Sequence, residues 1–195
     1  MINEYLEKFR ALMALDAGPN GIMGLNIDVY TARHSMVLDY SWAIPAEGAL
    51  DALAELGPIV EVGAGGGYWA ALLRARGVDI LAYDESPVGN RPNVQARRQW
   101  SEVRQAPAAV ARRHADRALF LCWPPYAMPM AFSALYGYLD RGGKTLAFVG
   151  ESDGGCTGNA DFFDLIDEHM VEAKTCSLPQ WPGIHDYLTI YTRKE

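Results

Sequence analysis

Two acidic residues and a run of glycines have the types and spacing needed to bind a ribose-containing ligand. The segment 61–67 reads Glu-Val-Gly-Ala-Gly-Gly-Gly and lies between a short apolar run and a helical pattern. Glycines at such a turn let the chain bend tightly and let a ligand approach the backbone closely. Asp84 ends the next apolar run, where a carboxylate can accept hydrogen bonds from both hydroxyl groups of a ribose.

Other uses of a glycine-rich turn fit this segment less well. The dinucleotide pattern GxGxxG would place glycine at position 68, where Tyr68 stands, and this counts against a nicotinamide cofactor. A phosphate-binding P-loop needs Gly-Lys-Ser/Thr at the start of the helix, and the segment has none. A structural turn that binds nothing stays open, although the paired acids Glu61 and Asp84 argue against it.

A second turn, Trp123-Pro124-Pro125-Tyr126, follows another strongly apolar run. Ligands of doubly wound sheets lie at the carboxyl ends of the strands. We therefore expect this turn to face the same crevice as the glycine segment. The alternative is that the two prolines only end a strand, with Trp123 as part of the core.

Further candidate residues lie before and after these two turns. Tyr40 and Trp42 precede the first core helix, where their rings could cover a ligand or simply pack onto the sheet. Asp153 follows a later strand, and His185 lies in a loop near the C-terminus. Either could act as a base, although both are also ordinary residues of exposed loops. The catalytic residue is unassigned, with Tyr126, Asp153 and His185 as candidates.

The elements that must position these residues alternate along the chain. Apolar runs predict strands at 59–62, 78–83, 101–105, 118–123, 144–150, 171–178 and 186–193. Helical spacing predicts helices at 4–15, 46–56, 67–76, 107–115, 128–140 and 161–170, and residues 22–45 show no regular pattern. The alternation predicts an α/β three-layer sandwich with a seven-stranded, mostly parallel sheet, whose last two strands form an antiparallel C-terminal hairpin.

The motif residues resemble the cofactor-binding motif of class I, Rossmann-like S-adenosylmethionine-dependent methyltransferases; they are Glu61, Gly63, Gly65, Gly67 and Asp84. The resemblance extends over roughly residues 46–193. It implies that the first acid supports the loop, that the glycines approach the methionine part of S-adenosylmethionine, and that the second acid holds the ribose. It also implies that Gln105, after the third strand, contacts the adenine.

The same resemblance implies different roles for the two parts of the chain. Residues 1–45 would form an N-terminal helix and a segment that covers cofactor and substrate. Residues 46–195 would form the methyltransferase domain, within one structural domain overall. The implied activity is methyl transfer to a small or medium acceptor, which the sequence does not identify.

The Pro-Pro-Tyr turn resembles the (D/N/S)-P-P-(Y/F/W) motif of amino-methyltransferases that act on adenine, cytosine or glutamine nitrogen. Trp123 stands where that motif has its polar first residue. An indole has one N–H donor and no comparable acceptor, so it cannot orient an amino group in the same way. We assign Trp123 to cofactor binding, and assign substrate binding to Tyr40, Trp42, Pro124 and Tyr126.

Composition and charge narrow the function classes. Half of the 195 residues are hydrophobic and 21% are charged, as in globular domains. The net charge of −7 disfavours a nucleic-acid partner, although several arginines gather between positions 91 and 117. The three cysteines have no metal-ligand spacing, and no apolar run reaches the ~18 residues that a membrane span needs.

These observations predict a cytoplasmic protein without a metal site, whose oligomeric state is open. Two alternatives remain beside methyl transfer to a small acceptor. One is an amino-methyltransferase that acts on a nucleic-acid base or a protein glutamine. The other is a fold member that binds the cofactor without catalysis. A nicotinamide oxidoreductase is disfavoured by Tyr68 and by the terminal hairpin.

Overall fold

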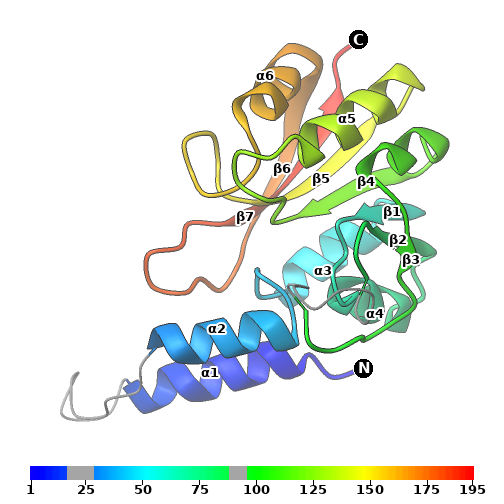
Figure 1. The fold of residues 1–195 in the computed structure, drawn as a ribbon. Helices are drawn as coiled ribbons and strands as arrows, with labels where there is room; N and C mark the ends of the chain where they lie inside the picture. The colour runs from blue at the N-terminus through cyan, green and yellow to red at the C-terminus, as the bar shows by residue number, and fades with distance from the viewer. Residues whose placement is uncertain (17–28, 88–95) are drawn as a thin grey trace.

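A seven-stranded sheet lies at the centre of the computed structural model, which describes residues 1–16, 29–87 and 96–195 (Figure 1). Its strands are β1 (Ile59–Val62), β2 (Ile80–Asp84), β3 (Arg104–Gln105), β4 (Ala118–Cys122), β5 (Thr145–Gly150), β6 (Met170–Ser177) and β7 (Tyr187–Arg193). Their order across the sheet is β3-β2-β1-β4-β5-β7-β6.

The direction of the last strand distinguishes this sheet from an all-parallel one. The first five strands, β1 to β5, run parallel to one another, whereas β7 is inserted antiparallel between β5 and β6. The loop between β6 and β7 has no helix, so these two strands can pair only as a hairpin. The predicted fold, including the C-terminal hairpin, is confirmed.

Helices cover both faces of the sheet, as a parallel sheet requires. α3 (Glu47–Ala54) and α4 (Tyr68–Ala75) lie on one face; α5 (Met130–Asp140), α6 (Ala160–His169) and the short 3₁₀ helix η1 (Ala108–Arg113) lie on the other. The side chains of β4 alternate between the two resulting core clusters. Phe120 packs with α3 and α4, while Leu119 and Leu121 pack with α5 and α6.

The N-terminal helices α1 (Glu4–Asp16) and α2 (Val29–Asp39) lie side by side below the α3–α4 layer (Figure 1). Tyr68, the first residue of α4, anchors α1 through its hydroxyl group. That hydroxyl accepts a hydrogen bond from the Tyr5 amide (3.1 Å) and donates one to Asn3 Oδ1 (3.0 Å). The residue that breaks the dinucleotide pattern therefore joins the N-terminal helix to the core. The domain boundary after residue 45 stays a prediction.

The prediction that residues 22–45 are irregular is wrong over Val29–Asp39, which form α2. Residues 22–28 lie outside the described part of the chain. The sequence of α2 does not separate apolar from polar residues onto two faces, so its pattern gave no helical signal. Hydrogen bonds from residues far along the chain hold the C-terminal end of α2 instead. The Arg97 amide donates to Leu38 O, and Trp100 Nε1 donates to Asp39 O, each at 2.7 Å.

Two further predictions, both for the segment that follows β2, are corrected by the structure. The strand expected at 101–105 is reduced to Arg104–Gln105, because only these residues pair with β2 at the edge of the sheet. The helix expected at 107–115 is a 3₁₀ helix over Ala108–Arg113. A 3₁₀ helix is the usual form for so short a segment.

Candidate active site

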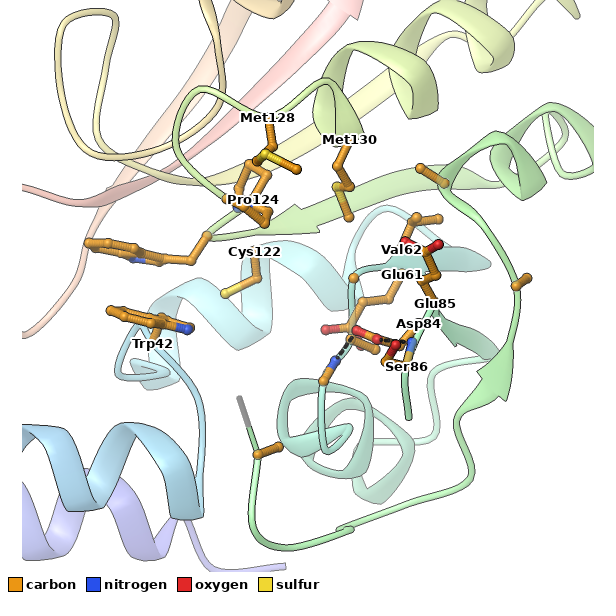
Figure 2. A pocket seen from close by; sticks show the side chains of 18 of the residues that line it. Trp42, Glu61, Val62, Asp84, Glu85, Ser86, Cys122, Pro124, Met128 and Met130 are labelled. Carbon is orange, nitrogen blue, oxygen red and sulfur yellow. Dashed lines mark hydrogen bonds between the residues drawn. The ribbon is translucent and has the colours of Figure 1, made fainter. Parts of the chain in front are cut away.

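A cavity of about 710 Å³ opens at the carboxyl ends of β1, β2 and β4. This is the end of a doubly wound sheet at which ligands bind, and the volume falls within the range of small-molecule pockets. Figure 2 shows two halves with different chemistry. Acidic and polar side chains line one half, namely Glu61, Asp84, Glu85 and Ser86. Apolar side chains line the other half, among them Trp42, Cys122, Pro124, Met128 and Met130.

The glycine turn and Asp84 form one hydrogen-bonded unit. Asp84 Oδ2 accepts a hydrogen bond from the Gly65 amide (2.9 Å), and Asp84 Oδ1 accepts one from the Ser86 amide (2.7 Å; Figure 2). Gly65 has a φ of +53°, and a Cβ added there would meet no atom within 4 Å, so the turn leaves open space on its cavity side. Each carboxylate oxygen has a second lone pair, so Asp84 can still accept hydrogen bonds from a ligand.

Glu61 lies at the floor of the cavity and is only 1% exposed. Its Oε2 has no hydrogen-bond partner among the described residues. Burial is the main reason that the pKa of Glu61 is raised to about 8; the nearby Asp84 raises it further, and Arg74 opposes the shift. A buried carboxyl group with an unpartnered oxygen is suited to a cationic group of a ligand, which would satisfy that oxygen.

A pair of stacked indoles closes the apolar half. The rings of Trp42 and Trp123 lie 5.4 Å apart at an interplanar angle of 15°. Trp123 has a φ of +50°, a conformation that bulky residues rarely adopt. Its Nε1 donates to Asp186 Oδ2 at 2.9 Å, which fixes the ring. The Arg33 guanidinium lies over both rings, at 5.5 Å and 6.0 Å from their centroids.

Solved structures of methyltransferases have this arrangement of elements. Magnesium protoporphyrin IX methyltransferase from Synechocystis PCC 6803, solved with bound S-adenosylmethionine, is 11% identical with a TM-score of 0.51; the match covers 98% of this chain and 95% of that one. The 1,6-didemethyltoxoflavin-N1-methyltransferase of Burkholderia thailandensis, solved with 1,6-didemethyltoxoflavin and S-adenosylhomocysteine, is 16% identical with a TM-score of 0.50, covering 98% and 89%. This chain has the Rossmann-like methyltransferase fold.

The similarity to these proteins lies in their structures. No protein-family model matches the sequence, and neither does any curated protein. At such low identities the methyltransferase fold identifies the architecture and leaves the chemistry to be argued from the site itself.

The methyltransferase fold brings most of the predicted site residues together. Those that line the cavity are Glu61, Gly63, Gly65, Asp84, Tyr40, Trp42, Trp123 and Pro124. Tyr40 also has a packing role. Its ring stacks on Tyr5 at 5.0 Å and on Trp100 at 5.2 Å, so it joins α1 to the wall of the cavity.

Two predicted cofactor residues lie outside the cavity lining. A Cβ at Gly67 would meet Ser101 Oγ at 2.7 Å and Val103 Cγ2 at 2.8 Å, so this glycine allows close packing of the protein itself. Gln105 is exposed, and its amide Nε2 donates to Glu85 O at 3.0 Å. The cavity wall near this point comes from the following residues, Ala106, Pro107, Ala108 and Ala109. A role of Gln105 at the adenine stays a prediction.

The three catalytic candidates also lie outside the cavity lining. Tyr126 is 67% exposed, and Asp153 and His185 are exposed as well. The buried residue between their loops is Glu151. Its Oε1 accepts a hydrogen bond from the His185 amide (2.9 Å) and its Oε2 accepts one from the Cys156 amide (2.8 Å). Although burial acts to raise it, these amide donors hold the pKa of Glu151 below its ordinary value. Glu151 thus ties two loops beside the site.

Sequence reasoning missed several residues of this site. Met128 and Met130 line the apolar half, and Cys122 lies between the two halves. Their place directly after β4 and at the start of α5 was a usable signal, because those positions reach the ligand edge of the sheet. Arg33 and Asp186 had no such signal, since their contacts with the indole pair join distant parts of the chain.

No arginine of the described part of segment 91–117 lines the cavity. Arg97 pairs with Asp39 at 3.9 Å, and Arg98 lies over the Trp100 ring at 3.7 Å. Arg117 contacts the carbonyl of Ile59, at the opposite end of the sheet. Within the described ranges, no group of three His, Cys, Asp or Glu residues could hold a metal ion, and no helix is long and apolar enough to cross a membrane.

Proposed function

We propose that this chain binds S-adenosylmethionine in the cavity and transfers its methyl group to a small acceptor. One observation carries the proposal. The described lining residues include three carboxyl groups, Glu61, Asp84 and Glu85, and no Lys, Arg or His. S-adenosylmethionine has a sulfonium and an ammonium group, whereas a nicotinamide dinucleotide has an anionic pyrophosphate that this lining would repel.

The site residues have distinct expected roles. Asp84 would accept the ribose hydroxyls with the lone pairs that the backbone amides leave free. The unpartnered Oε2 of Glu61 would accept a hydrogen bond from the ammonium group. Gly65 keeps the backbone open to the ligand. When bound, S-adenosylmethionine supplies an electrophilic methyl group, and the protein mainly has to align an acceptor with it.

Two of the similar structures support this proposal by what they were solved with, S-adenosylmethionine in one and S-adenosylhomocysteine in the other. The amino-methyltransferase alternative has no comparable support. The Trp123 N–H, its one polar group, already donates to Asp186. We therefore propose a small-molecule acceptor in place of a nucleic acid or a protein glutamine.

Calorimetric titration with S-adenosylmethionine, S-adenosylhomocysteine and NAD tests the proposal. We expect the first two to bind and NAD not to bind. Asp84→Asn removes the charge and leaves an oxygen for the Gly65 amide, and should weaken binding at least ~10-fold, or about 1.4 kcal/mol. Asp164→Asn, an exposed acid on α6, is the matched control and should bind as the wild type does. Absence of binding to either methionine-type ligand by the folded protein would refute the function.

A further inference from the structure

The apolar half of the cavity limits which acceptors the protein can use. Its described lining residues include Trp42, Trp123, Pro124, Met128 and Met130, none of which is charged. The nearest cation, Arg33, lies over the two indoles and is not among the described lining residues. A charged acceptor would therefore lose its hydration there without an ion pair from the lining, and this is costly. The half therefore fits an uncharged, apolar molecule.

The shape of this half favours a flat molecule. The two indoles are parallel within 15°, and the hydrogen bond from Trp123 to Asp186 holds one of them in place. Aromatic rings gain ~0.5–1.5 kcal/mol from stacking beyond the area that they bury. Thioether side chains such as those of Met128 and Met130 also contact ring edges favourably. Stacked indoles and two thioethers on one side of the cavity therefore suit an aromatic ring.

The described residues that line the apolar half offer no base for the acceptor near neutral pH. Burial raises the pKa of the Cys122 thiol well above its ordinary value, and the neighbouring Glu61 adds to the shift, so the thiol stays protonated. The Tyr40 hydroxyl donates to Glu4 and accepts from Lys8. Glu61 belongs to the acidic half. Asp186 has a buried Oδ1 without a partner among the described residues, but it lies outside the cavity lining, behind the Trp123 ring whose N–H it accepts. The described lining residues of the apolar half include no His, Lys, Asp or Glu.

From these three observations we infer the substrate class: a planar aromatic molecule without a charged substituent, whose nucleophilic atom has an available lone pair without a protein base. An aromatic thiol that ionises by itself and a ring nitrogen both meet this requirement, whereas an aliphatic alcohol does not. The inference rests on the proposed function. The acceptor's lone pair forms the bond to the methyl carbon as the carbon–sulfur bond breaks, and the electron pair of that bond neutralises the sulfonium. A thiol proton leaves to solvent before attack.

The test uses probes with one two-ring scaffold and different nucleophiles. They are naphthalene-2-thiol, isoquinoline, naphthalene-2-methanol and a sulfonated naphthalenethiol, each assayed with saturating S-adenosylmethionine by mass spectrometry of the methylated product. We expect methylation of the thiol and of isoquinoline at least ~10-fold faster than that of the alcohol, and a higher KM for the sulfonated thiol. The pH profile should move with the ionisation of the thiol that is used, because no protein base sets it.

Substitutions of Trp42, one of the two stacked indoles, separate acceptor binding from cofactor binding. Trp42→Ala should raise the KM for naphthalene-2-thiol at least ~5-fold, and Trp42→Phe should restore most of the loss because it keeps a flat ring. The Kd for S-adenosylmethionine should change little in both. Tyr136→Ala, which removes an exposed ring on α5 outside the cavity lining, is the matched control.

Three results would overturn the inference while leaving the proposed function in place. They are comparable methylation of the alcohol, preference for the sulfonated probe, and failure of a protein that binds S-adenosylmethionine to bind or methylate any neutral probe. Failure to bind S-adenosylmethionine at all is a different result. It would refute the proposed function and the inference together.

Discussion

At the scale of single residues, Glu61 and Asp84 show how the same side-chain chemistry acquires two roles from its surroundings. Asp84 lies at the end of β2 and uses its carboxylate to hold the glycine turn. Glu61 lies one strand away in the core, where burial raises its pKa to about 8 and so keeps it protonated near neutral pH. Burying this carboxyl group costs the fold some stability, and the proposed role of Glu61 at the ammonium group would explain why it is kept.

The pKa of Glu61 predicts how stability changes with pH. Between the ordinary value of 4.5 and about 8, this carboxyl group is ionised in the unfolded chain and protonated in the folded protein. Unfolding then releases a proton, so raising the pH through this window favours unfolding by at most about 1.4 kcal/mol per unit. The free energy of unfolding of Glu61→Gln should therefore increase relative to that of the wild type as the pH is raised from 5 to 8, as measured by urea unfolding.

The control for this prediction is Glu7→Gln, an exposed acid on α1. It should keep the same difference from the wild type at both pH values, because its side chain stays in solvent when the chain folds. Parallel behaviour of Glu61→Gln and Glu7→Gln would show that Glu61 is ionised in the folded protein.

At the scale of elements, the N-terminal helices pack against residues that form the wall of the site. Tyr68 on α4 holds α1 by its hydroxyl group, and Tyr40 after α2 stacks between Tyr5 and Trp100. This aromatic cluster continues to the cavity through Tyr40. The order of α1 and α2 should therefore affect the site even though neither helix belongs to the sheet.

Tyr68→Phe tests this link. The substitution keeps the ring but leaves the Tyr5 amide and Asn3 Oδ1 without the hydroxyl, which should cost ~1–3 kcal/mol of unfolding free energy. Amide hydrogen exchange should become faster in α1 than in α5. Tyr136→Phe, with a side chain 57% exposed on α5, should change stability little. Equal losses in the two variants would argue against a specific anchor.

At the scale of the whole molecule, charge works against a nucleic-acid partner. The chain has 24 acidic and 17 basic residues. Several of the arginines that cluster in sequence have local partners in the structure, such as Asp39 for Arg97 and Glu102 for Arg104. All the charged residues that line the described cavity are acids. A polyanion would meet repulsion both at long range and at the mouth of the site.

We accordingly predict no measurable binding of a fluorescent oligonucleotide, single- or double-stranded, at ionic strength of about 0.15 M. The same protein preparation should bind S-adenosylmethionine by calorimetry, which serves as the control for folding. Micromolar affinity that weakens steeply with added salt would contradict the prediction and would favour the amino-methyltransferase alternative.

The sequence by itself determined the architecture and the acidic half of the site. Strand-length apolar runs that alternate with helical patterns leave few topologies open, and a hairpin without an intervening helix must be antiparallel. Glu61, Gly65 and Asp84 could be placed together because residues that follow parallel strands meet at one edge of the sheet. These inferences need only local pattern and the geometry common to all such sheets.

Only the tertiary structure decided the position of α2 and the apolar half of the site. α2 forms because distant backbone and indole groups bond to its end, and its own pattern does not show it. Trp42 and Trp123 meet face to face, with Arg33 above them and Asp186 behind. Such contacts join segments far apart in the chain, and they depend on how side chains fill space between elements. Periodicity and spacing do not encode that arrangement, so it appears only when the chain is folded.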